Sequence, residues 1–206
     1  MKFILTITFT LLLTQLNFLQ AQTEEPKTKL ILNINGVEYK LDEGEELKLD
    51  ETIENPVLSI SLAKNKTLDA GAFVFDYPKH FNYGYDESYA LKNWTLDGSD
   101  FVVMCFEMTF PTPLTDFVNE MVNQFGKKNC VVSNSEMKLG NQIIEGKRID
   151  VSLIGQKLSI DFLEIKSADR ISRFIAFQDT LDENGAATEE SKFAIEVISN
   201  SIQYRD

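Results

Sequence analysis

The segment from Phe101 to Met108 constrains the fold more than any other part of this 206-residue chain. Successive side chains of a strand point to opposite faces, and here both alternating sets are apolar. One set holds Val102, Met104, Phe106 and Met108, and the other holds Phe101, Val103 and Cys105. A strand that is apolar on both faces belongs inside a sheet covered on both sides. We therefore expect residues 101–108 at the centre of a layered fold.

Most of the remaining apolar pattern also predicts strands. Alternating apolar residues and turn signals place them at residues 30–34, 37–41, 47–49, 58–62, 73–77, 130–137, 142–153, 157–165 and 170–178. The last four are joined by short connections, which implies antiparallel hairpins. Two amphipathic helices are expected, one over residues 113–125 with Thr112 as N-cap and one beginning near Thr188. Together these elements predict an α+β fold: a mainly antiparallel β-sheet with helices on both faces, plus an N-terminal β-hairpin.

The first residues predict the compartment. Lys2 precedes an apolar run over residues 3–13, and the small residue Ala21 follows at a plausible cleavage point, which is the pattern of a signal peptide. The run is too short to span a bilayer. We predict a signal peptide at 1–21, an N-terminal strand and hairpin extension at 22–56, and an α+β domain at 57–206. The product is expected to be exported, periplasmic or extracellular, without stable membrane insertion after cleavage.

The net charge of the chain limits the kinds of partner that it is expected to bind. The formal net charge is −12, and without residues 1–21 it is 19 − 32 = −13, because only Lys2 is lost from the charged residues. This charge repels phosphate backbones and anionic lipid surfaces. We therefore expect no nucleic-acid partner, and instead a protein or another component of the cell envelope.

The two cysteines, Cys105 and Cys130, leave two readings open. An even number of cysteines in an oxidising compartment favours one disulfide. The alternative is two buried free thiols, since the sequence does not give their separation in space.

The sequence carries few signals of catalysis. His80 is the only histidine and falls in a predicted surface turn, so any Ser-His-Asp or Cys-His arrangement would depend on it. No nucleophile-elbow, zinc-protease or phosphate-loop pattern occurs. We expect no catalytic residue, no metal and no cofactor. Two alternatives remain: a small carboxylate-based hydrolase, for which no particular pair of acids stands out, and a protein that holds a small apolar ligand between sheet and helix.

An aromatic-rich connection is the one stretch that suggests binding. Tyr83, Tyr85, Tyr89 and Trp94 lie between two predicted strands, where loops on a rigid scaffold often carry recognition. The alternative is that these side chains cap the core at a sheet edge.

Two segments carry a family resemblance. Residues 73–78, Phe-Val-Phe-Asp-Tyr-Pro, with Phe81, Trp94 and Gly98 before the apolar strand, resemble the opening of the PsbP and Mog-type superfamily. The closing segment, residues 198–204, is similar to that family's last helix and tail. The resemblance spans about residues 57–206 and implies an α/β/α sandwich without a shared active site. It also implies an accessory role, because relatives mostly bind or stabilise other proteins. We therefore expect an exported, non-catalytic binding or accessory protein of the cell envelope.

Overall fold

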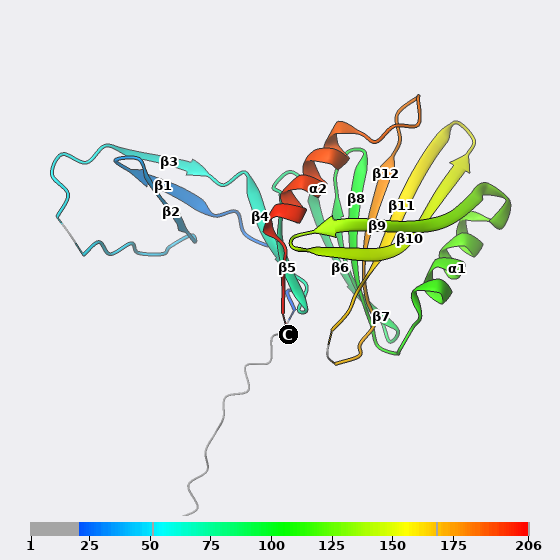
Figure 1. Cartoon of the computed structure of the whole chain (residues 1–206). Helices are drawn as coiled ribbons and strands as arrows, with labels where there is room; N and C mark the ends of the chain where they lie inside the picture. The colour runs from blue at the N-terminus through cyan, green and yellow to red at the C-terminus, as the bar shows by residue number, and fades with distance from the viewer. Residues whose placement is uncertain (1–20, 51, 168, 206) are drawn as a thin grey trace, which may run out of the picture.

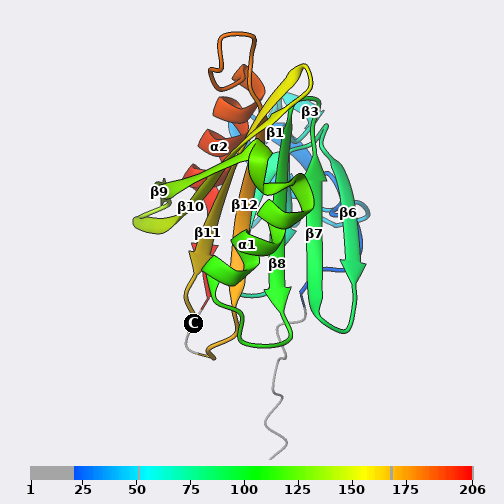
Figure 2. The same ribbon diagram turned by 90° about the vertical axis from the view of Figure 1, so that its right-hand side faces the viewer.

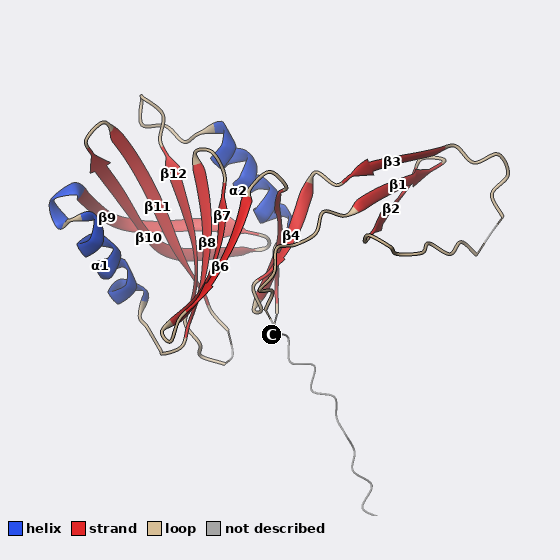
Figure 3. Ribbon diagram, turned by 180° about the vertical axis from the view of Figure 1, so that it is seen from behind, coloured by secondary structure: helices blue, strands red, loops and turns tan. Residues whose placement is uncertain are grey.

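The computed structural model describes residues 21–50, 52–167 and 169–205, so all but the last residue of the predicted signal peptide lies outside the described residues. The described chain forms three antiparallel sheets and two α-helices (Figures 1 and 3). In chain order the elements are β1 (Leu30–Ile34), β2 (Val37–Leu41), β3 (Leu58–Leu62), β4 (Asn65–Asp69), β5 (Phe73–Pro78), β6 (Asn82–Glu87), β7 (Leu91–Asp97), β8 (Phe101–Met108), α1 (Leu114–Phe125), a 3-10 turn (Lys127–Asn129), β9 (Cys130–Leu139), β10 (Gln142–Leu153), β11 (Gln156–Ile165), β12 (Arg173–Thr180), α2 (Glu189–Ser201) and β13 (Gln203–Tyr204).

The largest sheet has seven strands in the order β6-β7-β8-β12-β11-β10-β9. β8 pairs with β7 on one side and with β12 on the other, so the prediction that residues 101–108 form an interior strand is confirmed. Its side chains enter two separate cores. Val103 and Cys105 are fully buried in one core, and Phe106 is buried in the other. The doubly apolar pattern of the strand follows from this position.

The two cores lie on opposite faces of the large sheet. The core next to α1 includes Ile160, Phe162 and Phe174 of the sheet, together with Val118 and Phe117 of the helix. The other core joins Leu163 and Phe177 to strand β5 and to Ala194 and Ile198 of α2. It also contains the largest buried aromatic side chains of the first half of the domain, Phe73, Phe75, Tyr77, Phe81, Trp94 and Phe101.

The prediction of one sheet with helices on both faces is wrong. The chain is mainly antiparallel β in three sheets, and its described residues form only two α-helices. α1 lies over one face of the large sheet (Figure 2) and packs on β10 and β11. By contrast, α2 contacts mainly β5 of the small sheet β13-β5-β4, and also β9. The face opposite α1 is therefore covered largely by strands. Alternating aromatic residues give β5 a wholly buried face, which takes the place of a helical layer.

The N-terminal sheet differs from the predicted hairpin by one strand. β1 and β2 form the hairpin that Asn35-Gly36 predicts, and both turn residues have positive φ. β3, which the sequence assigned to the larger domain, pairs with the other edge of β1. The resulting sheet β2-β1-β3 stands away from the rest of the molecule (Figure 1). Residues 47–49, predicted as a short strand, belong to the irregular connection between β2 and β3.

The cysteines are not bonded to each other, so of the two readings the disulfide is wrong and the free thiols are found. Cys105 is buried on the α2 side of the large sheet, and Cys130 lies at the start of β9 beside the α1 core. The sheet itself separates the two thiols, and a disulfide needs the Cα atoms within about 7 Å.

Candidate binding cleft

The ladder between β10 and β11 ends before either strand ends. Their pairing runs from Leu153–Gln156 to Gly146–Leu163. Beyond that pair β10 continues to Gln142 and stays paired with β9, while β11 continues to Ile165 and stays paired with β12. The described residues 143–145 and 164–166, which would be the next partners, form no pairs with each other. The large sheet therefore splits open at this point.

Gly146 marks the apex of the opening. A Cβ atom at this position would lie 2.1 Å from the carbonyl oxygen of Phe162, and 2.8 Å from Cδ2 of Leu163. Only glycine permits such a close approach of the two backbones. The two strands are thus pressed together at Gly146, and they diverge on its N-terminal side, at residues 143–145 of β10.

The tip of the β9–β10 hairpin is held by the C-terminal elements. The Gly140 N–H donates to the Ser199 carbonyl at 2.9 Å, and the Ser199 hydroxyl donates to the Lys138 carbonyl at 2.9 Å. The Tyr204 hydroxyl donates to the carbonyl of Leu139, a fully buried residue. These contacts fix the hairpin tip on α2 and β13, away from the end of β11.

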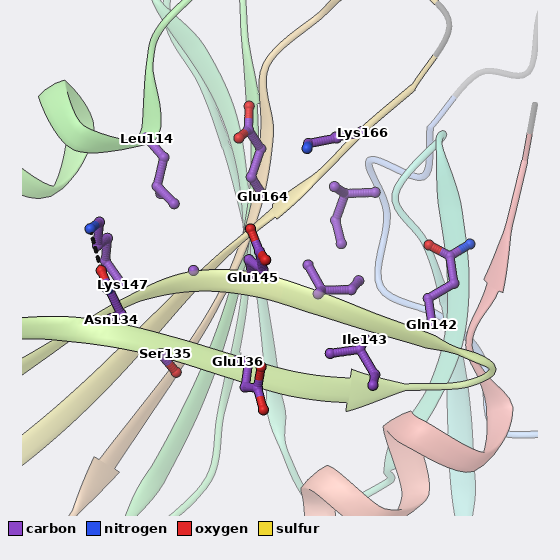
Figure 4. A pocket seen from close by; sticks show the side chains of 13 residues that line it. Leu114, Asn134, Ser135, Glu136, Gln142, Ile143, Glu145, Lys147, Glu164 and Lys166 are labelled. Carbon is purple, nitrogen blue, oxygen red and sulfur yellow. Dashed lines mark hydrogen bonds between the residues drawn. The ribbon is translucent and has the colours of Figure 1, made fainter.

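The opening is a cleft of about 970 Å³ (Figure 4). Its lining residues are Leu114, Asn134, Ser135, Glu136, Gln142, Ile143, Ile144, Glu145, Gly146, Lys147, Glu164, Ile165 and Lys166. Ile144 and Ile165 are buried in the core on the α2 side, so they form the floor. Leu114, the first residue of α1, lines the opposite side. The walls are mostly polar, which differs from the closed apolar cavity that a small apolar ligand would need.

Three glutamates line the cleft, one on each of three neighbouring strands. Glu136 of β9 is the register partner of Glu145 of β10, and Glu164 of β11 would be the next partner of Glu145 if the ladder continued. Figure 4 shows Glu145 and Glu164 facing the opening, with Lys166 nearby. Like charges on directly opposite residues oppose strand pairing. Glu136 and Glu145 stay paired despite this cost, whereas Glu145 and Glu164 do not pair.

An ion pair between the exposed Arg148 and the buried Asp161 closes the sheet on the other side of the apex. Asp161 of β11, with only 4% of its surface exposed, accepts hydrogen bonds from both Nε and Nη2 of Arg148. It also accepts one from the Ser135 hydroxyl of β9. The hydrogen bond to Asp161 raises the pKa of Arg148, against the opposing effect of burial. This network ties β9, β10 and β11 together next to the cleft, so the cleft has a rigid inner end.

The four aromatic residues proposed from the sequence lie outside the cleft: Tyr83, Tyr85 and Trp94 lie together, and Tyr89 lies apart from them. β6 and β7 replace the irregular connection that was expected there. Trp94 is 1% exposed, and its indole N–H donates to the Gln22 carbonyl, which also accepts from the Tyr83 hydroxyl at 3.2 Å. Tyr85 packs against Trp94 and donates to Glu87 at 2.6 Å. Burial, followed by this hydrogen bond, raises the pKa of Tyr85 to about 12.

Tyr89 is the only one of the four that is freely exposed, at 84%. It lies in the turn between β6 and β7, with its ring 5.4 Å from that of Phe110. Trp94 and Tyr83 therefore anchor the start of the described chain, and Tyr89 marks a separate small aromatic spot.

The carboxyl groups with displaced pKa values also lie outside the cleft. Hydrogen bonds from Arg173 lower the pKa of Asp169, and backbone N–H groups lower that of Asp182. Burial alone would raise the pKa of Glu190, but backbone N–H groups and His80 outweigh it and lower the value. Each of these groups has a local structural partner.

The described residues hold no group of three or more His, Cys, Asp or Glu side chains arranged to bind a metal. None of the helices in the described part of the chain has the length and hydropathy needed to cross a bilayer.

Sequence reasoning missed the cleft, although one signal was present. Gly146 interrupts the predicted strand 142–153, and an isolated glycine in a strand often marks a bulge or a close backbone approach. Its position between Glu145 and Lys147 gave no hint of function by itself.

The fold and the cleft together define a mainly antiparallel β protein whose large sheet opens between two of its strands. A scan against protein-family models and a search of curated proteins both found no match.

Proposed function

We propose that this protein is an exported, non-catalytic binding protein that accepts an extended segment of a partner envelope protein in the cleft between β10 and β11. One observation carries the proposal. Residues 143–145 and 164–166 present two facing strand edges that have no partner on the cleft side within the described part of the chain. Unpaired edges recruit additional strands, and β-strand addition is a recurring mode of peptide recognition.

The lining of the cleft suits a polypeptide segment. Each free edge spans three residues, or about 10 Å of strand, and offers backbone N–H and C=O groups for hydrogen bonding. Ile143 and Leu114 supply apolar contacts, while Glu145, Glu164 and Lys166 supply both signs of charge. Backbone edges would supply affinity and these side chains would supply selectivity.

Export is part of the same proposal. Support comes from Lys2, the short apolar run that follows and Ala21. The resemblance to the PsbP and Mog-type superfamily adds support for an accessory role, because its members mostly bind or stabilise other proteins. A cell fractionation with intact mass of the recovered protein tests this point: we expect an exported chain that begins near Gln22. A full-length chain recovered from the cytoplasm would contradict it.

The cleft is tested by photo-crosslinking in the native cell. A benzoylphenylalanine is introduced at Ile143, which is exposed in the cleft, or at Ile154, which is exposed in the turn after β10. We expect a discrete crosslinked product from position 143 and none from position 154. Equal products from both positions, or none from position 143, would argue against the cleft.

Amide hydrogen exchange on the purified complex separates strand addition from other contacts. If the partner adds a strand, the amides of residues 143–145 and 164–166 that face the cleft become protected on binding. If other amides become protected while these amides exchange as before, the partner does not bind by strand addition.

A further inference from the structure

The register of the N-terminal sheet places nine apolar side chains on one face. Each row joins one residue of β3, one of β1 and one of β2. The three rows are Leu62, Leu30, Leu41; Ile60, Leu32, Tyr39; and Leu58, Ile34, Val37. The opposite face carries Ser61, Ile31, Lys40, Ser59, Asn33 and Glu38. The sheet thus has one apolar face and one mainly polar face, as a sheet covered on one side should.

Among the described residues, β1 is partly covered and Ile34 is only 5% exposed, but the edge strands leave much of this apolar face open. All five residues of β3 are exposed, including Ile60 at 71% and Leu62 at 55%. Val37 of β2 is 54% exposed, and neither hydrophobic core of the main domain includes any residue of this face. The sheet projects from the main domain, as Figures 1 and 3 show. An exposed apolar surface of this size on a small sheet is typical of an interaction site.

An acidic segment adjoins the same sheet. Residues 42–54 connect β2 to β3 and contain seven Asp or Glu residues and one lysine, Lys48. The described acids of this segment lie on an irregular, largely exposed connection that runs in a wide arc beside the sheet (Figure 1). The sheet is therefore bordered by strong negative charge.

The size of the apolar face and the charge of the acidic segment indicate which kind of partner binds there. Three strands of five residues cover a footprint of about 17 by 14 Å, far below the ~800 Å² per partner of a stable protein interface. A second copy would also bring two acidic segments together, which opposes association. One amphipathic helix is about 10 Å wide, and three turns span about 16 Å. We propose that the apolar face of the β2-β1-β3 sheet docks a short amphipathic helix of another protein, with Lys or Arg along its borders.

The proposal is independent of the cleft, and a model peptide tests it. The probe is a labelled 14-residue helix of leucine and lysine with its leucines on one face, compared with a leucine–glutamate peptide of the same pattern. Fluorescence anisotropy with the full chain should detect binding of the basic peptide only. Raising the salt from 0.1 to 0.5 M should weaken that binding at least fivefold, because exposed charges are screened.

Two substitutions on the same strand locate the docking face. Ile60→Asp places a charge on the apolar face and should weaken the basic peptide at least tenfold, whereas Ser59→Asp adds the same charge to the polar face and should leave binding within twofold. The fluorescence of Trp94, the only tryptophan, reports whether the main domain remains folded. Equal binding by both variants would overturn the proposal. A concentration-dependent dimer lost in Ile60→Asp would also overturn it, as would binding to neutral lipid vesicles in place of the peptide.

Discussion

Single residues decide where the large sheet opens. At Gly146, any added side chain meets the Phe162 carbonyl, so the apex of the cleft depends on the absence of a Cβ atom. Gly84 offers a matched comparison, because a Cβ there would meet Thr95 at 3.8 Å, an ordinary contact. Both glycines lie in strands of the same sheet.

We predict that Gly146→Ala destabilises the main domain by about 1–3 kcal/mol, the usual cost of overpacking. Gly84→Ala should change stability by less than about 1 kcal/mol. Denaturant unfolding followed by Trp94 fluorescence measures both. Equal stability of the two variants would mean that the backbones at the apex relax freely.

The thiols should react in a fixed order. Burial raises the pKa of both cysteines, but Cys105 is fully enclosed, whereas Cys130 is partly exposed at the start of β9. The thiolate is the reactive form, so both burial and a raised pKa slow labelling. Intact mass after maleimide treatment should show one label on the folded chain, at Cys130, and two after unfolding. No label on the unfolded chain would indicate a disulfide.

At the scale of elements, Glu190 joins α2 to the turn between β7 and β8. One of its carboxylate oxygens accepts hydrogen bonds from the N–H groups of Ser99, Asp100 and Phe101, at 2.7–3.1 Å. Its other oxygen lies 3.2 Å from Nε2 of His80. The first turn of α2 is separately capped by Thr188, whose hydroxyl accepts from the Ser191 N–H.

Glu190 gives the stability a defined pH dependence. Because its pKa is lower in the folded state than the ordinary value of 4.5, its contribution is fully present above that value and is lost as pH falls through the folded pKa. We expect Glu190→Gln to cost about 1–3 kcal/mol at pH 7, with the deficit shrinking under acid. Glu189→Gln, an exposed neighbour, should have little effect. Thermal unfolding between pH 3 and pH 7 measures both, and a pH-independent deficit would contradict the assignment.

The elements also show how far sequence reasoning reached. β8 and the start of α2 at Thr188 were predicted correctly, because each depends on a local pattern. α1 begins one residue later than expected, with Pro113 in place of Thr112 as N-cap. β6 and β7 were missed because Gly84, Asp86 and Asn93 are poor strand formers, and the ladders of β6 with β7 and of β7 with β8 override that preference.

The cleft could not be predicted, since the end of a ladder depends on how two distant strands diverge, and the pattern of each strand alone looks continuous. The covering of the second face was predicted wrongly for a similar reason. The sequence of β5 shows a strand, but only its pairing with β4 and β13 makes it a layer. The family resemblance stays a prediction.

At the scale of the whole molecule, the two parts should differ in local stability. β8, β11 and β12 are interior strands between two cores, whereas the described residues form no separate core around β1, β2 and β3. Opening a region with few buried apolar contacts costs little free energy. Native-state hydrogen exchange should therefore show amides of β1–β3 exchanging much faster than those of β8, β11 and β12. Comparable protection in both parts would mean that the N-terminal sheet is covered.

The last residues of the chain complete the core to which β5 contributes. β13 pairs with β5, and Ile198 and Ile202 fill the same core as Phe73 and Phe75. A chain emerging from the ribosome offers its β5 segment more than a hundred residues before those partners exist. We expect the main domain to stay unfolded until synthesis is nearly finished. A newly made chain would therefore remain able to pass through an export channel for most of its time on the ribosome.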